Sequence, residues 1–322
     1  MMNRILVPLD GSGLAERALP LAWGIASRTR ADLLLISAVV PSEQWAGLAT
    51  SDPADAKELS AANDYLESVA EPLRTHRLKV RTLAVNDRAA TAICAAADGA
   101  GCDLIVMATH GRSGLGGWFV GSVAERVRHT SDTPVLLVHA RRETIPQATG
   151  IGRILVPLDG SEPAEEVLAL AEELARALDA RLLLAQIVVS PAALYPEEYT
   201  TQAFPALTAI QEAAQAYLAG LASNIRERGL EVDLRVDVGE PTATLLEIAS
   251  DGGVDMIAMT TRGASAVGRF VMESVADAVS RAIEVPCLVV RARKWSDGSP
   301  TGPTTNGASA STQASERARR TS

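Results

Sequence analysis

A nine-residue segment occurs twice in this 322-residue chain. RILVPLDGS stands at residues 4–12 and again, unchanged, at residues 153–161, an offset of 149 residues. Three more segment pairs follow at an offset of 152: DLIVM and DMIAM from Asp103 and Asp255, SVAE and SVAD from Ser122 and Ser274, and PVLLV and PCLVV from Pro134 and Pro286. Self-similarity over this length predicts two homologous domains in tandem.

The repeat predicts where the domains begin and end. The first domain is expected over residues 1–140 and the second over residues 153–293, joined by a polar linker at residues 141–152 that contains Pro146 and Gly150. Residues 294–322 are rich in Ser, Thr, Gly and Pro and have almost no large aliphatic side chains. Such a segment cannot bury enough apolar surface to order itself, so we expect a disordered tail.

Short apolar runs alternate with segments of helical periodicity in each repeat. In the first repeat, strands are expected at residues 5–9, 33–40, 80–85, 104–108 and 135–138, and helices at residues 12–25, 59–73 with a bend at Pro72, 89–97 and from Ser122. This alternation predicts an α/β fold: two doubly wound, Rossmann-like domains, each with a five-stranded parallel sheet. Each sheet is expected to end in a short apolar strand, at residues 135–138 and 288–290. Because bare edges invite pairing, these strands should meet within one chain across a pseudo-twofold axis.

Composition excludes several classes of function. The formal net charge of −9 argues against binding to nucleic acid or to an anionic membrane surface, because both need a basic face. No apolar stretch has the length of a membrane span and the first residues lack the features of a signal peptide, which predicts a cytoplasmic protein. The three cysteines are expected to be reduced thiols, and the four histidines share no metal-ligand spacing, so no metal site is expected.

A glycine-rich loop follows the fourth expected strand. It contains Gly111, Gly114, Gly116, Gly117 and Gly121, and a helix is expected to begin directly after it. A strand, a glycine loop and a helix N-terminus together form an anion site, because glycine lets the backbone approach a phosphate and the helix presents free N–H groups. The loop lacks the lysine of a P-loop and does not match a dinucleotide fingerprint.

An alternative explains part of the same segment without a ligand. Ser122 and Glu125 have the spacing of a capping box, which would start a helix on its own. That alternative accounts for Ser122 and leaves the five glycines unexplained.

Two motifs of the first repeat resemble those of the universal stress protein family. VPLDGS follows the first strand, and Ala108-Thr-His-Gly111 is followed by nine residues and then Gly121-Ser122. Family members that bind ATP have G-x-x-G, nine residues, then G-[ST]; this chain departs at Ala108. The resemblance covers both repeats and implies a tandem member that binds ATP, with or without Mg²⁺.

The resemblance also implies which residues bind the nucleotide. Asp10 and Pro8 would meet adenine and ribose, with Ala38 beside the base. The backbone at Ala108 and Gly111 would face ribose and phosphates. The terminal phosphates would be held by three residues, Gly121, Ser122 and Val123. Gly114 belongs to the same loop, and Arg112 is expected to clamp a phosphate, with a solvated side chain as the alternative. For Asp10 the alternative is a plain Asp-Gly-Ser turn.

The second repeat departs from the motif at one position. Thr260, Thr261, Arg262 and Gly263 are followed by nine residues and then Glu273-Ser274, so a glutamate replaces the phosphate-facing glycine. A carboxylate about 4 Å from a phosphate charge costs roughly 1–4 kcal/mol per charge pair. A weaker second site is therefore expected; its residues are Pro157, Asp159, Ile187, Thr260, Gly263, Ser274 and Val275. On charge alone, Glu273→Gly would raise the number of bound nucleotides toward two.

The expected function is that of an ATP-binding regulatory stress protein. Nucleotide is held mainly by the first domain, and its occupancy tunes contacts with a protein partner that the sequence does not identify. Two alternatives stay open: a slow ATPase of the same fold, for which the sequence offers no assigned catalytic residue, and an interaction module that binds no nucleotide. Pairing of the domains within the chain is expected, and a further homodimer stays open.

Overall fold

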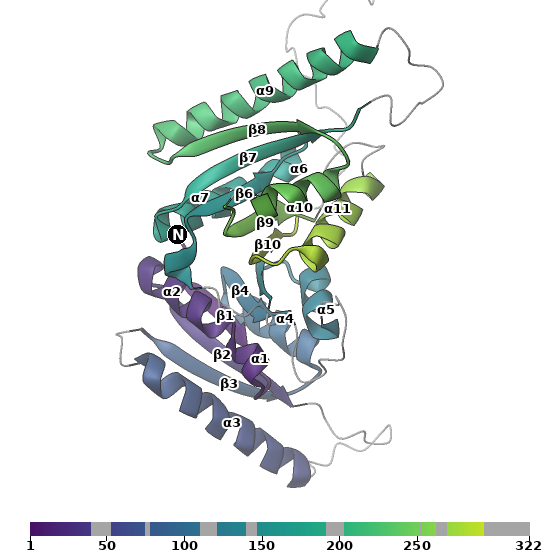
Figure 1. Ribbon diagram of the computed structural model, residues 1–322. Coiled ribbons are helices and arrows are strands. Elements are labelled where there is room, and N and C mark those ends of the chain that lie inside the picture. The colour runs from purple at the N-terminus through teal and green to yellow at the C-terminus, as the bar shows by residue number, and fades with distance from the viewer. Residues whose placement is uncertain are drawn as a thin grey trace, which may run out of the picture. The chain divides into compact units, whose positions relative to one another are not determined.

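The computed structural model describes residues 1–39, 53–74, 78–109, 121–139, 147–190, 203–251, 253–261 and 269–292 (Figure 1). For residues 53–54, 203–206 and 269–274 it describes the backbone alone. The chain divides into one compact unit, Met1–Ala292, and a second, Arg293–Ser322. The predicted tail lies outside the described residues, and so do Gly111, Arg112, Gly114 and Gly263.

Strands and helices alternate in both halves, as the sequence predicts. The first half has β1 (Arg4–Pro8), α1 (Gly13–Glu16), α2 (Leu19–Thr29), β2 (Asp32–Val39), α3 (Pro53–Arg74), β3 (Val80–Asn86), α4 (Ala89–Ala100), β4 (Leu104–Ala108), α5 (Ser122–Thr130) and β5 (Val135–Val138). The short helix η1 (Ala148–Gly150) follows. The second half has β6 (Arg153–Pro157), α6 (Glu162–Glu165), α7 (Leu168–Leu178), β7 (Arg181–Val188), α9 (Ala203–Glu227), β8 (Val232–Val238), α10 (Pro241–Asp251), β9 (Met256–Thr260), α11 (Arg269–Ala282) and β10 (Cys287–Val290).

All ten strands form one sheet, in the order β3-β2-β1-β4-β5-β10-β9-β6-β7-β8 (Figure 1). Pairs within each half are parallel, whereas β5 and β10 pair antiparallel. Leu136 stands opposite Leu288, its own counterpart in the repeat, and Val135 stands opposite Val289. The predicted pairing of the two edge strands is therefore present, with a register that a pseudo-twofold axis requires.

Each face of the sheet is covered by helices. One apolar core lies beneath α2, α3, α7 and α9, and a second lies beneath α4, α5, α10 and α11. Helices that follow β1 and β4 therefore leave toward opposite faces, although these strands are neighbours. Such a reversal opens a crevice at the carboxyl ends of the strands, where ligands of doubly wound folds bind.

The first expected helix is two helices. α1 ends at Glu16 and α2 begins at Leu19, with Pro20 in its first turn. Proline has no N–H and is best tolerated in the first turn of a helix. The second half breaks at the same place between α6 and α7, where Ala169 stands in place of Pro20, so the proline is not required for the break.

The linker contributes to the core. Ala148 and Ile151 are buried, and η1 lies against α2. A Cβ atom at Gly24 of α2 would lie 2.4 Å from the Cβ of Ala148, a distance that packed atoms do not adopt. Gly24 is therefore required for the close approach of η1. The described part of the linker is a packed element, which its polar composition did not predict.

Across the described ranges, no helix has both the length and the apolar character needed to span a bilayer.

Candidate functional site

A pocket of about 220 Å³ lies at the carboxyl ends of β1, β2 and β4, beside the starts of α4 and α5. Its lining comes from segments far apart in the sequence: Pro8, Leu9, Asp10, Ala15, Ile36, Ala38, Ala89, Ile93, Met107, Ala108, Thr109, Gly121, Ser122, Val123 and Ala124. Seven residues predicted for nucleotide binding are among them: Pro8, Asp10, Ala38, Ala108, Gly121, Ser122 and Val123. The structure thus brings these seven positions around one cavity.

The pocket has an apolar side that the sequence did not predict. Ile36 ends the pairing of β2 with β1, Ile93 lies in α4, and Met107 lies in β4. All three are at least 96 % buried and line the cavity. Polar side chains come from Asp10, Thr109 and Ser122. A cavity with apolar walls and a few polar groups is the usual form of a small-molecule site.

Strand β2 extends beyond its neighbour at the pocket. Its pairing with β1 ends at Ile36, whose carbonyl accepts a hydrogen bond from the N–H of Leu9 at 2.8 Å, whereas its pairing with β3 continues to Val39. Backbone groups of alternate residues point to the same side of a strand. The N–H and C=O of Ala38 therefore point, like those of Ile36, to the side on which β1 has ended and the pocket opens.

Helix α5 begins at the pocket. Gly121 is its N-cap, and the N–H of Gly121 donates to the carbonyl of Thr109. The first hydrogen bond of the helix runs from the N–H of Glu125 to the carbonyl of Gly121 at 2.9 Å. The N–H groups of Ser122, Val123 and Ala124 precede that bond, and all three residues line the cavity. This is the arrangement in which a helix start favours an anion.

The capping box predicted from Ser122 and Glu125 is wrong in register. Ser122 is the first helical residue and Gly121 is the cap. Glu125 instead accepts hydrogen bonds from Arg128 at 2.9 Å and lies 3.0 Å from the Nε2 of His129. The helix start is thus built without a serine cap.

Asp10 lies in a turn and also lines the pocket. Its Oδ1 accepts hydrogen bonds from the N–H of Ser12 at 3.0 Å and from the hydroxyl of Ser12 at 2.6 Å. Gly11 has φ = +78°, which suits glycine. Ser12 in turn caps α1 by accepting from the N–H of Ala15. The turn interpretation of the Asp-Gly-Ser segment is therefore confirmed, and this turn places Asp10 at the cavity, whereas contact of Asp10 with adenine and ribose stays a prediction.

The equivalent region of the second half is built differently. The counterpart positions are Pro157 at the end of β6, Asp159 two residues after it, and Ile187 in β7. Asp159 accepts the same two hydrogen bonds from Ser161. Helix α11, however, begins at Arg269, five residues before Ser274, the counterpart of Ser122. The backbone of residues 273–275 therefore lies inside the helix, where N–H groups bond to carbonyls one turn back.

The burial of Val275 agrees with this difference between the two halves. Val275 is 3 % exposed, whereas its counterpart Val123 is 37 % exposed. Val123 is the second residue of α5, whereas Val275 lies in the seventh position of α11 and is buried there.

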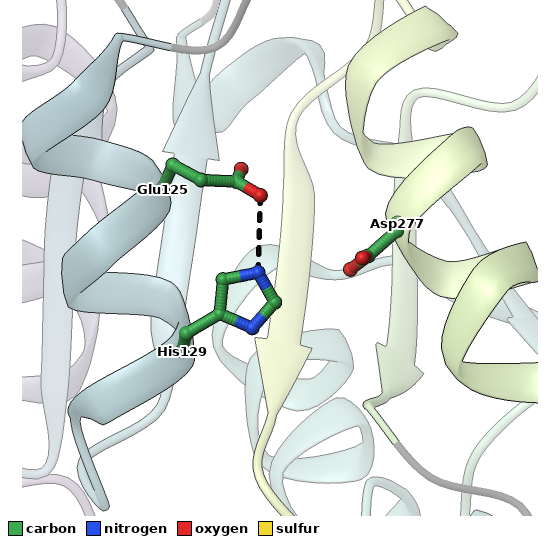
Figure 2. A group of neighbouring side chains, drawn as sticks. All are labelled: Glu125, His129 and Asp277. Carbon is green, nitrogen blue, oxygen red and sulfur yellow. Dashed lines mark hydrogen bonds and ion pairs between the residues drawn. The ribbon is translucent and has the colours of Figure 1, made fainter. Parts of the chain in front are cut away.

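A second group of polar side chains lies between α5 and α11. Glu125 and His129 project from α5 and Asp277 from α11 toward one space (Figure 2). One ligand atom from each lies within 4.8 Å of the others, a spacing that could hold a metal ion. The guanidinium of Arg128 already fills this space: its Nη2 lies 2.9 Å from Glu125 Oε1 and 2.8 Å from His129 Nε2, and its Nη1 lies 2.6 Å from Asp277 Oδ1.

These distances decide between a metal ion and the arginine. Metal–ligand bonds of about 2 Å to the same atoms would place an ion against the guanidinium. Burial alone raises the pKa of Glu125, but the charge of Arg128, its hydrogen bond and that of His129 more than offset this and hold the pKa below its usual range. The group is an ion-pair network in which the guanidinium of Arg128 is the cation.

Comparison with known proteins identifies the family of this chain. A model of the universal stress protein family matches residues 1–139 and 150–291. This chain belongs to the universal stress protein family. The two matches correspond to the two halves of the sheet, so the chain is a tandem member with an α/β fold.

Two relatives match a little under half of this chain, and one solved structure matches nearly all of it. A universal stress protein of Thermus aquaticus is 35 % identical over 138 residues, which cover 43 % of this chain and 99 % of the relative. A putative universal stress protein of Staphylococcus haemolyticus is 33 % identical over 140 residues, covering 43 % and 83 %. The crystal structure of a universal stress protein from Archaeoglobus fulgidus matches 91 % of this chain and 97 % of its own at 20 % identity, with a TM-score of 0.65.

Proposed function

We propose that this universal stress protein binds one adenine nucleotide, ATP, in the pocket of its first half. The observation that carries the proposal is that the start of α5 and the overhanging end of β2 line the same cavity. The N–H groups of Ser122, Val123 and Ala124 offer donors to phosphate oxygens. At the other side, the N–H and C=O of Ala38 offer one donor and one acceptor, which complement N1 and the N6 amino group of adenine.

The apolar side of the pocket supports a planar base. Ile36, Ile93 and Met107 provide a surface on which a base can pack, and a purine gains from leaving water there. Asp10, Thr109 and Ser122 add oxygen atoms, the ligand type that Mg²⁺ accepts, so a nucleotide carried with Mg²⁺ fits the chemistry of the lining.

We place hydrolysis second. Among the described lining residues, Asp10 is the only carboxylate, and it already accepts two hydrogen bonds from Ser12. Binding without rapid turnover suits a regulatory role in which nucleotide occupancy changes contacts with a protein partner.

The test identifies the ligand directly. Mass spectrometry of small molecules released from the purified protein should detect adenine nucleotide, and calorimetry of the emptied protein should give a Kd for ATP in the micromolar range. GTP should bind at least about 10-fold more weakly, because guanine presents a donor at N1 and an acceptor at O6 to the backbone of Ala38. Equal binding of GTP would contradict the assignment of the base, and no binding of either would leave the protein an interaction module.

A further inference from the structure

One buried arginine contacts a carboxylate from each half of the protein. The side chain of Arg128 is 0 % exposed, although it carries a full charge. It donates to Glu125 on its own helix, α5, and forms an ion pair with Asp277 on α11 of the second half. Both carboxylates point into the space between the two helices (Figure 2). Burying a charge this completely is tolerated only when opposite charges surround it.

The two carboxylates are counterparts in the repeat. The offset of 152 that pairs Leu136 with Leu288 across the junction also relates Glu125 to Asp277. A group that contacts both members of such a pair, at 2.9 Å and 2.6 Å, lies near the pseudo-twofold axis itself. The counterpart of Arg128 is Ser280, which is also fully buried and donates to the carbonyl of Asp277 at 3.0 Å.

The space near the pseudo-twofold axis has room for one arginine side chain. If two first halves paired through β5, the twofold axis would place both copies of Arg128 in the same volume. If two second halves paired through β10, two copies of Asp277 would meet without the buried arginine. Only a first half with a second half brings one arginine to two carboxylates.

We propose that Arg128 is the element that makes the two halves pair with each other and rejects pairing between like halves. The favoured partner of the first half at this junction is the second half of the chain. Arg128 gives unlike halves an attractive ion pair and gives two first halves a steric clash, and specific interfaces combine attraction and repulsion in this way. The proposal does not depend on nucleotide binding.

Single substitutions in the 322-residue chain reproduce the side chains of both like pairings. Arg128→Ser gives each half a serine, as in a pair of second halves, and Ser280→Arg gives each half an arginine, as in a pair of first halves. Each variant should lower the melting temperature by roughly 5–10 °C. Arg128→Ser leaves two carboxylates without their buried cation, and Ser280→Arg places two arginine side chains in a space that holds one.

The swap Arg128→Ser with Ser280→Arg is the decisive variant. It moves the one arginine to the other half, from which it reaches the same two carboxylates. It should melt within about 3 °C of the unaltered protein, and it should fold even if Arg128→Ser alone does not. Arg126→Ser, on the same helix, serves as a matched control and should change the melting temperature by less than about 2 °C.

Two outcomes would overturn the proposal. If Ser280→Arg melts at the parental temperature, the junction accommodates two arginines and does not reject like halves. If the swap is no more stable than the weaker single variant, Arg128 acts through packing on α5 alone and not as a cation shared about the axis.

Discussion

Gly121 is the N-cap of α5, and its backbone conformation does not require a glycine. Its φ and ψ are −56° and 145°, which any residue can adopt. The backbone conformation therefore accepts a side chain at this position, and Gly121 lines the pocket where α5 begins. The proposed nucleotide site, and not the backbone conformation, is the reason to expect a glycine at this position.

Gly121→Glu should therefore remove ATP binding and leave the fold intact. The substitution copies Glu273 and places a carboxylate near phosphate, which costs about 1–4 kcal/mol per charge pair, or roughly 5- to 1000-fold in affinity. Calorimetry measures the affinity, and thermal unfolding should show no more than a small change.

Gly121→Ala is the matched control, because it adds a Cβ without a charge and should keep affinity within a few-fold of the parent. A folded Gly121→Glu variant with unchanged affinity would show that this loop does not meet the phosphates.

Single residues differ in how well the sequence predicted their place. Asp10, Ala108 and Gly121 stand in local motifs at strand ends and helix starts, and local motifs can be found without a structure. Ile36, Ile93 and Met107 stand in apolar runs that look alike whether they face a core or a cavity. Their role follows from where β2 outlasts β1 and where α4 crosses the sheet, and tertiary packing alone decides that.

The strands were predicted more accurately than the helices. The strands fall within a residue or two of their expected places, because apolar runs in a parallel sheet are buried on both faces. The separation of α1 from α2 was missed, since Leu14, Ala18, Leu21 and Ile25 keep one helical spacing across the break. Apolar spacing reports a common buried face and not a continuous backbone.

The early start of α11 had a signal in the sequence. Gly117 and Gly121 of the first repeat correspond to Arg269 and Glu273 of the second. Glycine disfavours a helix by about 1 kcal/mol relative to alanine, whereas arginine and glutamate favour one. Replacing both glycines therefore favours the earlier helix start seen at Arg269 in α11, whereas α5 starts at Ser122.

The contact between α2 and η1 gives a prediction for the linker. Gly24→Ala should lower the free energy of unfolding by about 1–3 kcal/mol, because the new methyl group overlaps Ala148. Ala148→Gly in the same chain should recover most of the loss by vacating that space. Denaturant unfolding measures both variants.

Gly220→Ala in α9 is the control, since a Cβ there meets nothing within 4 Å, and it should leave stability unchanged or raise it by up to about 1 kcal/mol. A Gly24→Ala variant as stable as the parent would show that η1 does not pack on α2 in solution.

At the scale of the whole molecule, the repeat predicted the architecture and the structure shows how the symmetry is broken. The offset between the repeats fixes which residues are counterparts, and from that the antiparallel pairing of β5 with β10 follows. The placement of Arg128 on the axis could not follow, because neither half alone contains Asp277 together with Glu125. The halves share one sheet but differ in where α5 and α11 start and in which half supplies the buried arginine.

This asymmetry predicts that the chain binds about one ATP. The first half offers the N–H groups of Ser122, Val123 and Ala124 at its pocket, whereas the corresponding groups of the second half lie inside α11. Charge and backbone therefore both oppose a second site. On charge alone, Glu273→Gly would open a second site. Because this substitution removes the carboxylate but leaves a helical backbone, we expect the variant still to bind about one ATP.

Arg269→Gly combined with Glu273→Gly copies both glycines of the first repeat and should shorten α11, raising the number of bound nucleotides toward two. Calorimetric stoichiometry with ATP, supported by far-ultraviolet circular dichroism for the loss of helix, distinguishes the cases. A second tight site after Glu273→Gly alone would mean that charge, and not the extended helix, closes the second half. Two tight sites in the unaltered protein would refute both arguments, because neither the glutamate nor the helix would then exclude phosphate.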